Sequence, residues 1–215
     1  LAADGEVMVS GSAMLGYLGE EGAAGSQIAT GDLGHLDAEG YLHITGRAKD
    51  VIIRGSHNID PGLVEEAFLA HPVVALCAVV GEPDAYAGEL PVAFVTLKPG
   101  AACDPARLLA DVALHVYERP ATPKRVTIID AMPVTAIGKI YKPALRLRAV
   151  ETKLAEMLAD VPGTAVQGRE QGGVLSAVVT LAGAPDAALA QRLRDRLAAI
   201  AVPVAFHFSA AATPP

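Results

Sequence analysis

The chain has 215 residues, of which 52% are hydrophobic and 19% charged, and this composition supplies a packed core and excludes disorder throughout. Its formal net charge of −7 is spread along the chain without a basic stripe, so we expect no nucleic-acid partner. No run approaches the roughly 18 strongly apolar residues of a transmembrane helix, so we expect no membrane span.

Residues 1–48 have the pattern of short strands. Segment 5–11, "GEVMVSG", alternates between polar and apolar residues, and segment 34–47, "GHLDAEGYLHITGR", predicts two strands around the turn "DAEG". We therefore expect a small β-rich subdomain at this end of the chain.

Residues 49–159 mix helices with strands. A helix is predicted after Asp60 as N-cap and Pro61 at N1, and a second one after Asp104. Buried strands are predicted in "VVALCAVV" and "PVAFVTLK", which flank the turn-rich "GEPDAYAGEL". The strand "RVTIID" and the amphipathic helix "YKPALRLRAVETKLAEMLAD" follow. This order predicts a central α+β domain, in which helices pack on a small sheet.

Residues 160–215, the C-terminal lobe, repeat this mixture on a smaller scale. They contain a predicted hairpin, a helix in "PDAALAQRLRDRLAAI" and a last strand in "VPVAFHF". The lobe is therefore predicted as an appended small α+β unit, and the whole chain as α+β. Its role and the oligomeric state of the protein are not indicated by any residue pattern.

The cysteines and histidines indicate the cellular compartment and the metal content of the protein. Cys77 and Cys103 have no CxxC spacing, which favours a reducing cytoplasm. The six histidines are scattered without a metal-ligand spacing, so we predict no structural metal. The first residue is leucine, and no basic segment precedes an apolar run, so we expect the interior of a longer chain rather than a signal peptide.

Three charged residues stand next to glycines: Asp32 in "TGDLG", Arg47 in "TGRAKD" and Lys139 in "AIGKI". We expect each of them at a sharp turn, where glycine lets the backbone approach a ligand closely. Each also has an ordinary interpretation, because aspartate after glycine is common in turns and loop cations are usually solvated. No one of them alone indicates a site.

Other motifs are less informative. The "GK" of "AIGKI" is not a phosphate-binding P-loop, because Ile140 replaces the required Ser or Thr. Glu65 and Glu66 are adjacent on a helix and point about 100° apart, so we interpret them as structural rather than as a catalytic pair. Lys142 is predicted to lie on the surface or on an approach path for phosphate.

The order of the charged motifs resembles the adenylate-forming (AMP-binding) enzymes, in the acyl-CoA synthetase branch. The resemblance is carried by "TGDLGHLDAEGYLHITGRAKDVIIRGSHNIDPGLVEE" and, further on, by "MPVTAIGKIYKPALR", and it covers about residues 5–150. It implies that residues 1–48 end a large adenylation domain and that residues 49–159 form its mobile C-terminal lid. In this family ATP activates a carboxylic acid as an acyl-adenylate, and coenzyme A then takes the acyl group after the lid has rotated.

The resemblance assigns roles to single residues. Asp32 and Arg47 match residues that bind the ribose of the nucleotide, and a carboxylate suits two neighbouring hydroxyls. Lys139 matches the catalytic lysine, which bridges the substrate carboxylate and the α-phosphate. Lys49 matches the hinge, where this family has either aspartate or lysine.

The loop "RGSHNIDP" matches the segment that meets the pantetheine arm of coenzyme A. Gly55 allows a close approach there. Ser56 stands where many relatives have a second glycine, and we interpret His57 as a hydrogen-bonding loop residue rather than a base.

The resemblance also implies what lies outside these residues. The family's phosphate loop and acid pocket belong to an upstream large adenylation domain, so we expect this chain alone to be inactive and to bind no cofactor. ATP or AMP with Mg²⁺, coenzyme A and a small carboxylic acid are then ligands of the full-length enzyme, and the identity of the acid is not indicated. Two alternatives stay open: an acyl-AMP ligase that acts on a carrier protein, and a non-catalytic regulatory or interaction module.

Overall fold

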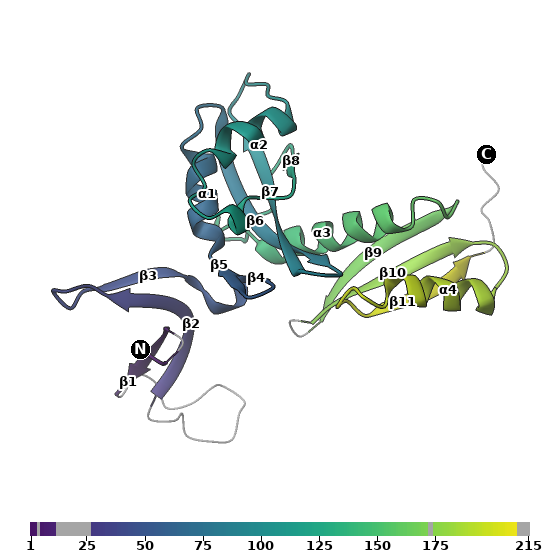
Figure 1. Ribbon diagram of the computed structural model, residues 1–215, viewed down its shortest axis with the longest axis horizontal. Coiled ribbons are helices and arrows are strands. Elements are labelled where there is room, and N and C mark those ends of the chain that lie inside the picture. Colours follow the sequence, from purple (N-terminus) through teal and green to yellow (C-terminus); the bar gives the residue numbers. More distant parts are fainter. Residues whose placement is uncertain (4, 12–26, 172–173, 210–215) are drawn as a thin grey trace.

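The computed structural model describes residues 1–3, 5–11, 27–171 and 174–209. These residues form three small sheets that follow one another along the chain (Figure 1), an N-terminal, a central and a C-terminal sheet. Helices pack on the central and C-terminal sheets, so the predicted α+β class is confirmed. Within the described residues, no helix has the length and apolar character needed to cross a bilayer.

The N-terminal sheet consists of three antiparallel strands in the order β1-β2-β3. Their bounds are β1 (Glu6–Ser10), β2 (Gln27–Leu36) and β3 (Leu42–Arg47). The prediction that Asp32 lies at a sharp turn is wrong, because it lies within β2. Arg47 ends β3 directly before the 3₁₀ turn Ala48–Asp50, and it is the direct cross-strand partner of Asp32. Gly31 has a φ of +76°, a conformation that favours glycine, and so bends β2 just before Asp32.

The central sheet has the order β5-β4-β7-β6. A fifth strand, β8, lies outside this order and pairs parallel with β7. Its strands are β4 (Ile52–Arg54), β5 (His57–Ile59), β6 (Val74–Asp84), β7 (Gly88–Leu97) and β8 (Val126–Ile128). The helices around it are α1 (Pro61–Leu69), α2 (Pro105–Ala113) and α3 (Lys142–Met157), with short 3₁₀ turns η1 (Ala48–Asp50) and η2 (Arg119–Ala121).

Local signals explain where the central elements begin. The Asp60 side chain accepts a hydrogen bond from the Gly62 N–H at 2.8 Å, and the Asp104 side chain accepts one from the Arg107 N–H at 2.9 Å. Both helices start with a proline at N1, as predicted. The helix after Asp104 ends at Ala113, earlier than the apolar spacing suggests.

The β6–β7 hairpin is longer than predicted, because both strands continue into "GEPDAYAGEL". The Asp84 carboxylate accepts hydrogen bonds from the Tyr86 and Ala87 N–H groups, and Gly88 takes a φ of +78°. The two backbone donors lower the pKa of Asp84. The turn in the predicted turn-rich segment is therefore confined to the residues between Asp84 and Gly88.

Both faces of the central sheet are buried. Cys77 and Val79 point to the side covered by α1 and α2, and Ala78 and Val80 point to the side covered by α3. Burial raises the pKa of the Cys77 thiol. This explains why β6 is a continuous apolar run rather than an alternating one.

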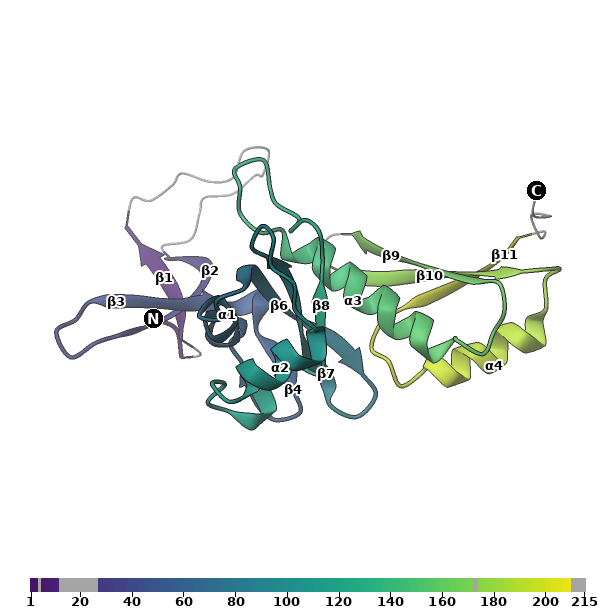
Figure 2. The same cartoon turned by 90° about the horizontal axis from the view of Figure 1, so that it is seen from above.

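Helix α3 belongs to two cores. Leu145 and Ala149 pack against the central sheet, while Val150 and Leu154 pack against the C-terminal sheet. Figures 1 and 2 show this helix running from the central sheet along the C-terminal one. The C-terminal sheet has the order β11-β10-β9. Its elements are β9 (Thr164–Gln171), β10 (Val174–Ala182), α4 (Ala187–Leu197) and β11 (Val204–Ser209).

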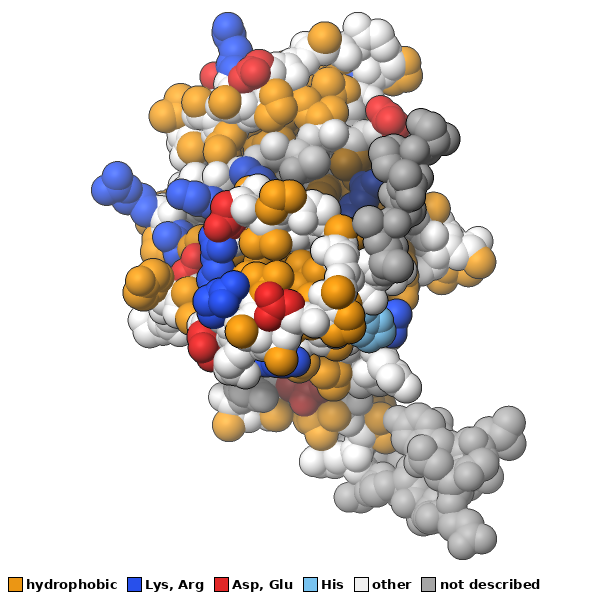
Figure 3. Space-filling view, turned by 90° about the vertical axis from the view of Figure 1, so that its right-hand side faces the viewer, with side chains coloured by type: hydrophobic (Ala, Val, Ile, Leu, Met, Phe, Trp, Pro, Cys, Tyr) orange, Lys and Arg blue, Asp and Glu red, His pale blue; other side chains and the backbone are white. Residues whose placement is uncertain are grey.

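The division of the chain at residues 48 and 159 stays a prediction, but the shared helix affects how the C-terminal lobe can be studied. Deleting residues 160–215 would expose Val150, Leu154 and Leu158, which are at most 1% exposed. Such a deletion changes stability as well as any role of the lobe. Figure 3 views the molecule from the lobe, where basic side chains gather in a strip among apolar ones. Arg192, Arg194 and Arg196 on α4 are exposed.

We expect Leu154→Ala to destabilise the protein by about 2 to 5 kcal/mol, because the side chain is fully buried between α3 and the C-terminal sheet. Leu114→Ala is the matched control, since Leu114 is 83% exposed and its truncation should change the unfolding free energy by less than about 0.5 kcal/mol. Urea denaturation measures both. Equal effects of the two substitutions would contradict the described core.

A buried ion pair joins the central sheet to α3. Glu82 on β6 is 2% exposed and pairs with Arg125, whose guanidinium also lies 3.7 Å from the carboxylate of Glu156 on α3. Burial raises the pKa of Glu82, and the charge of Arg125 opposes that rise. The pair therefore holds a carboxylate where an unpaired charge would be costly.

We expect Arg125→Met to cost about 3 to 5 kcal/mol near pH 7, because it leaves Glu82 charged and unpaired. Because the folded-state pKa of Glu82 lies above its unfolded value, this carboxyl contributes stability at low pH, and that contribution is lost as the pH rises through the folded pKa. The deficit of the variant should therefore shrink when the pH is lowered from 7 to 5. Denaturant unfolding across this range measures it, and a deficit that grows at low pH would contradict the buried pair.

Candidate functional site

Two adjoining clefts lie where the N-terminal sheet meets the central unit. The Asp32 cleft, of about 400 Å³, is lined by Asp32 and Arg47 on one side, by the start of α1 on another, and by Lys139. The Lys49 cleft, of about 390 Å³, is lined by Lys49, Arg47 and Lys139. Four of the predicted site residues, from three separate motifs, therefore meet in one region.

Asp32 and Arg47 form a cross-strand ion pair at the mouth of the Asp32 cleft. The Asp32 Oδ1 atom lies 2.9 Å from Arg47 Nε, and the side chains are 31% and 52% exposed. The backbone beneath is fixed, because the Gly31 N–H donates to Glu6 Oε1 and the Asp32 N–H donates to Thr30 Oγ1. An exposed pair of this kind is worth about 0 to 1 kcal/mol, so a hydroxyl-bearing ligand can displace it at little cost.

Lys139 stands on a small loop that is held by its own hydrogen bonds. The Tyr141 N–H donates to the Pro133 carbonyl at 2.8 Å, and the Thr135 N–H donates to the Lys139 carbonyl at 2.7 Å. The Lys139 N–H in turn donates to Thr135 Oγ1 at 3.1 Å. Gly138 has a φ of +80°, so the turn predicted beside Lys139 is confirmed. The loop presents the lysine from outside the core rather than burying it.

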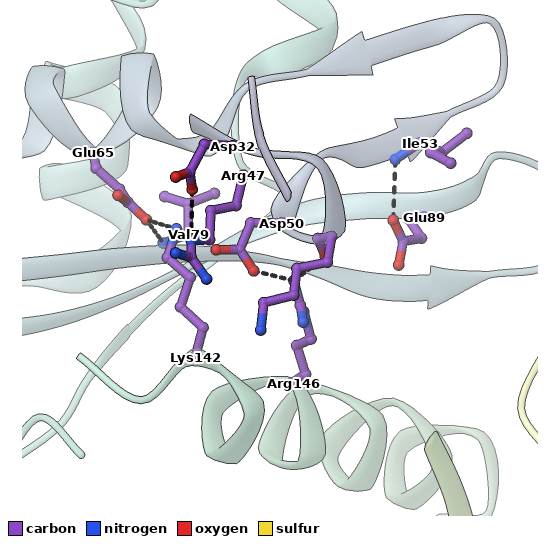
Figure 4. Close-up of polar contacts among 10 residues, drawn as sticks. Asp32, Arg47, Asp50, Ile53, Glu65, Val79, Glu89, Lys142 and Arg146 are labelled. Carbon is purple, nitrogen blue, oxygen red and sulfur yellow. Dashed lines mark hydrogen bonds and ion pairs between the residues drawn. The ribbon is translucent and has the colours of Figure 1, made fainter. Parts of the chain in front are cut away.

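Lys139 and Lys142 both line the Asp32 cleft, and they differ in their partners. Lys142 Nζ lies 2.8 Å from Glu65 Oε1 (Figure 4), and both side chains are only 17% exposed. Glu65 also accepts a hydrogen bond from the Val79 N–H at 2.7 Å. Of the two predicted positions of Lys142, the surface position is therefore wrong, and the approach path for phosphate stays a prediction. Glu65 has a structural role, as expected. For Lys139 Nζ, the described part of the chain supplies no ion pair.

Arg146 lines neither cleft but holds two residues of the Lys49 cleft, a contact that the sequence did not predict. Its Nη2 atom donates to the Lys49 carbonyl at 2.6 Å and to Asp50 Oδ1 at 2.7 Å. It follows Lys142 by four residues, which places both side chains on one face of α3, and this spacing was the available signal. Figure 4 shows both side chains reaching from α3 toward the same region.

The predicted coenzyme A loop lies apart from the two clefts. Gly55 has a φ of +59° in the turn between β4 and β5, and its N–H donates to the Ala87 carbonyl. Ser56 and His57 are exposed. None of the three lines either cleft. The structure therefore brings Asp32, Arg47, Lys49 and Lys139 together but leaves this loop outside.

The cleft suits a nucleotide better than a metal ion. The guanidinium of Arg47 and the ammonium of Lys139 fit phosphate and carboxylate oxygens. Mg²⁺ would require free oxygen ligands, and the cleft carboxylates already have protein partners. Over residues 1–3, 5–11, 27–171 and 174–209, no three His, Cys, Asp or Glu side chains form a metal-ligand set, so we assign no Mg²⁺ ligand here.

A family model and several known proteins match parts of this chain. Residues 63–139 match the family model of the AMP-binding enzyme C-terminal domain. The marinolic acid–CoA ligase of Pseudoalteromonas sp. is 45% identical over 135 residues, which cover 63% of this chain and 21% of that protein.

Two solved structures are similar as well. One is o-succinylbenzoate CoA synthetase (MenE) from Bacillus subtilis, in complex with the acyl-adenylate intermediate OSB-AMP; it is 33% identical with a TM-score of 0.58, over 66% of this chain and 30% of that one. The other is the amide bond synthetase McbA from Marinactinospora thermotolerans, 39% identical with a TM-score of 0.52, over 57% of this chain and 25% of that one. The chain thus spans between 21% and 30% of the length of these relatives.

We expect the two cleft lysines to differ in their effect on stability. Lys142→Met should cost about 1 to 3 kcal/mol, because it leaves the half-buried Glu65 carboxylate without its cation. Lys139→Met removes no ion pair that the structure records and should change the unfolding free energy by less than about 0.5 kcal/mol. Chemical denaturation of this chain compares them. A larger loss for Lys139→Met would mean that its ammonium is held by the protein itself.

Proposed function

Because this chain belongs to the adenylate-forming (AMP-binding) enzymes, as a C-terminal part in the acyl-CoA synthetase branch, we propose that it serves an ATP-dependent carboxylic acid–CoA ligase. Residues 1–48 then complete an upstream adenylation domain, and residues 49–159 form the mobile lid. Lys139, for which the described residues supply no ion pair, lines the same cleft as the Asp32–Arg47 pair, and this placement supports the proposal.

In the first half-reaction, a carboxylate oxygen of the acid attacks the α-phosphorus of ATP, and pyrophosphate leaves. Asp32 accepts hydrogen bonds from the ribose hydroxyls, and Arg47 binds beside it. The Lys139 ammonium contacts the carboxylate and the α-phosphate while negative charge shifts between them. At ~4 Å and an effective dielectric constant of ~20, such a contact is worth roughly 4 kcal/mol before desolvation, enough to affect the rate.

In the second half-reaction, the thiol of coenzyme A attacks the acyl carbonyl, and AMP leaves. The loop of Gly55, Ser56 and His57 is assigned to the pantetheine arm. In the described arrangement this loop lies outside both clefts, so the lid has to rotate about Lys49 before it can take part. The separation of the two sets of residues supports a two-state lid, one state for each half-reaction.

Several properties of the whole enzyme belong to the same proposal. Mg²⁺ accompanies ATP on the upstream domain, the enzyme acts in the cytoplasm, and this chain alone is catalytically inert because Lys139 has no acid pocket to serve. ATP–pyrophosphate exchange by the isolated chain at a rate near that of the parent enzyme would refute the last point.

The acyl acceptor is open to one competing proposal. An amide bond synthetase is about as similar to this chain as the CoA synthetase, so acceptors other than coenzyme A occur among its relatives. The alternative for this protein is an acyl-AMP ligase that loads the thiol of a carrier protein. Competition between coenzyme A and carrier protein for a preformed acyl-adenylate separates the two.

We expect Lys139→Ala in the full-length parent to lower ATP–pyrophosphate exchange by about 10²- to 10³-fold, because one preorganised charge-stabilising donor is lost. Thioester formation from supplied acyl-adenylate should fall less, since that step does not build charge at the α-phosphate. Lys153→Met is the matched control, because Lys153 lines neither cleft, and it should retain exchange within about threefold per folded molecule. Unchanged ATP–pyrophosphate exchange in Lys139→Ala would contradict the assignment of Lys139 as the catalytic lysine.

A further inference from the structure

The predicted hinge is held from both sides. Upstream of it, Arg47 is fixed to the N-terminal sheet twice, by its place opposite Asp32 in the β2–β3 ladder and by the 2.9 Å ion pair. Residue 47 therefore moves with the N-terminal sheet.

Downstream of the hinge, Arg146 fixes the chain to α3. The same Nη2 atom donates to the Lys49 carbonyl at 2.6 Å and to Asp50 Oδ1 at 2.7 Å. The side chains of Arg146 and Asp50 are only 21% and 19% exposed, so water screens this contact less than a surface pair. Leu145, next to Arg146, is fully buried against the central sheet and holds α3 in place.

Between these two attachments little holds the backbone. Ala48, Lys49 and Asp50 form a single 3₁₀ turn, which the Val51 N–H closes with a long hydrogen bond of 3.4 Å to the Ala48 carbonyl. Because the peptide plane from Lys49 to Asp50 is held by Arg146, rotation is left to the backbone dihedrals of Ala48 and Lys49.

We infer that Arg146 is a positioning residue that confines the swing of the lid to Ala48 and Lys49. The inference rests on the proposed function, which makes Lys49 the hinge. Lys139 and Arg146 lie at the start of the same helix or in the loop before it, so a clamp at Arg146 ties the pivot directly to the element that carries the catalytic amine. Without the clamp, Asp50 and Val51 join the flexible segment, and the lid samples more orientations about the N-terminal sheet.

Arginine suits this role better than lysine. Its planar guanidinium has several donors in fixed directions and serves a carbonyl and a carboxylate together, whereas an ammonium is a single point charge on a flexible stem. Arg146→Lys should therefore restore the clamp only in part. If Arg146 contributed only its charge to stability, lysine would replace it almost fully.

The test measures the distribution of distances between two spin labels by double electron–electron resonance. Labels at Glu39→Cys and Ala155→Cys sit at exposed positions on the β2–β3 hairpin and on α3, in a Cys103→Ser background that leaves only the buried Cys77. We expect Arg146→Met to broaden the distribution by about twofold, and Arg146→Lys to give an intermediate width.

Lys153→Met is the matched control. It removes another α3 cation, whose partner Asp84 lies 3.7 Å away and far from the hinge in the chain, so the width should stay that of the unsubstituted chain. An unchanged width in Arg146→Met, or equal broadening in Lys153→Met, would overturn the inference. Melting temperatures measured on the same samples separate general destabilisation from a looser joint.

The full-length parent supplies a second readout. We expect Arg146→Met to lower kcat of both half-reactions by about tenfold with the KM for ATP unchanged, because Lys139 and the Gly55 loop are then delivered less often to a site that still binds nucleotide. Loss of nucleotide binding instead would overturn the positioning role. If Lys139→Ala left exchange unchanged, the proposed ligase function would fall, while the distance distributions would still decide whether Arg146 confines the joint.

Discussion

The burial of α3 on two sides is the constraint on which the rest of this structure depends. Leu145 and Ala149 close the core of the central sheet, and Val150 and Leu154 close that of the C-terminal sheet. Close packing leaves such a helix little freedom to slide or turn, because each shift would open voids in two cores. The residues at its first turn therefore have a fixed place relative to both sheets. Lys142 and Arg146 use that fixed place to reach α1 and the η1 turn.

The candidate site combines fixed and free charges. Every carboxylate that lines the Asp32 cleft has a partner within the protein, either a cation or a helix terminus. Such neutralised surroundings keep the local field from being strongly negative, so an anionic ligand meets little repulsion. Lys139 adds a positive charge, for which the described residues supply no ion pair, on a loop with hydrogen bonds of its own. The paired residues thus maintain the cleft, while the proposed function assigns the catalytic contact to Lys139.

Local sequence signals predicted much of the fold. Asp60 and Asp104 each precede a proline and start a helix, since capping depends on neighbouring residues only. The course of β2 was missed because the glycine beside Asp32 indicates a turn, while the strand is held by pairing with β3. The β6–β7 hairpin was underestimated for the same reason, since its Gly, Pro and Asp residues are typical of loops.

The contacts around the site were less accessible to sequence reasoning. Asp32, Arg47, Lys49 and Lys139 were predicted from the family resemblance, whereas the contacts of Lys142 and Arg146 were not. The Arg146–Asp50 contact joins residues 96 positions apart, and no periodicity links their positions. The partner of Lys142 likewise depends on how α1 and α3 lie on opposite sides of β6.

The sharing of α3 also has a mechanical consequence. A body that turns about a point near the η1 turn displaces its remote parts most, and the C-terminal lobe lies at the opposite end of α3 from that point (Figures 1 and 2). Under the proposed rotation of the lid, the far strands of the lobe would sweep a wider arc than the loop of Lys139. Viscous drag on the lobe would then add to the time that each reorientation takes.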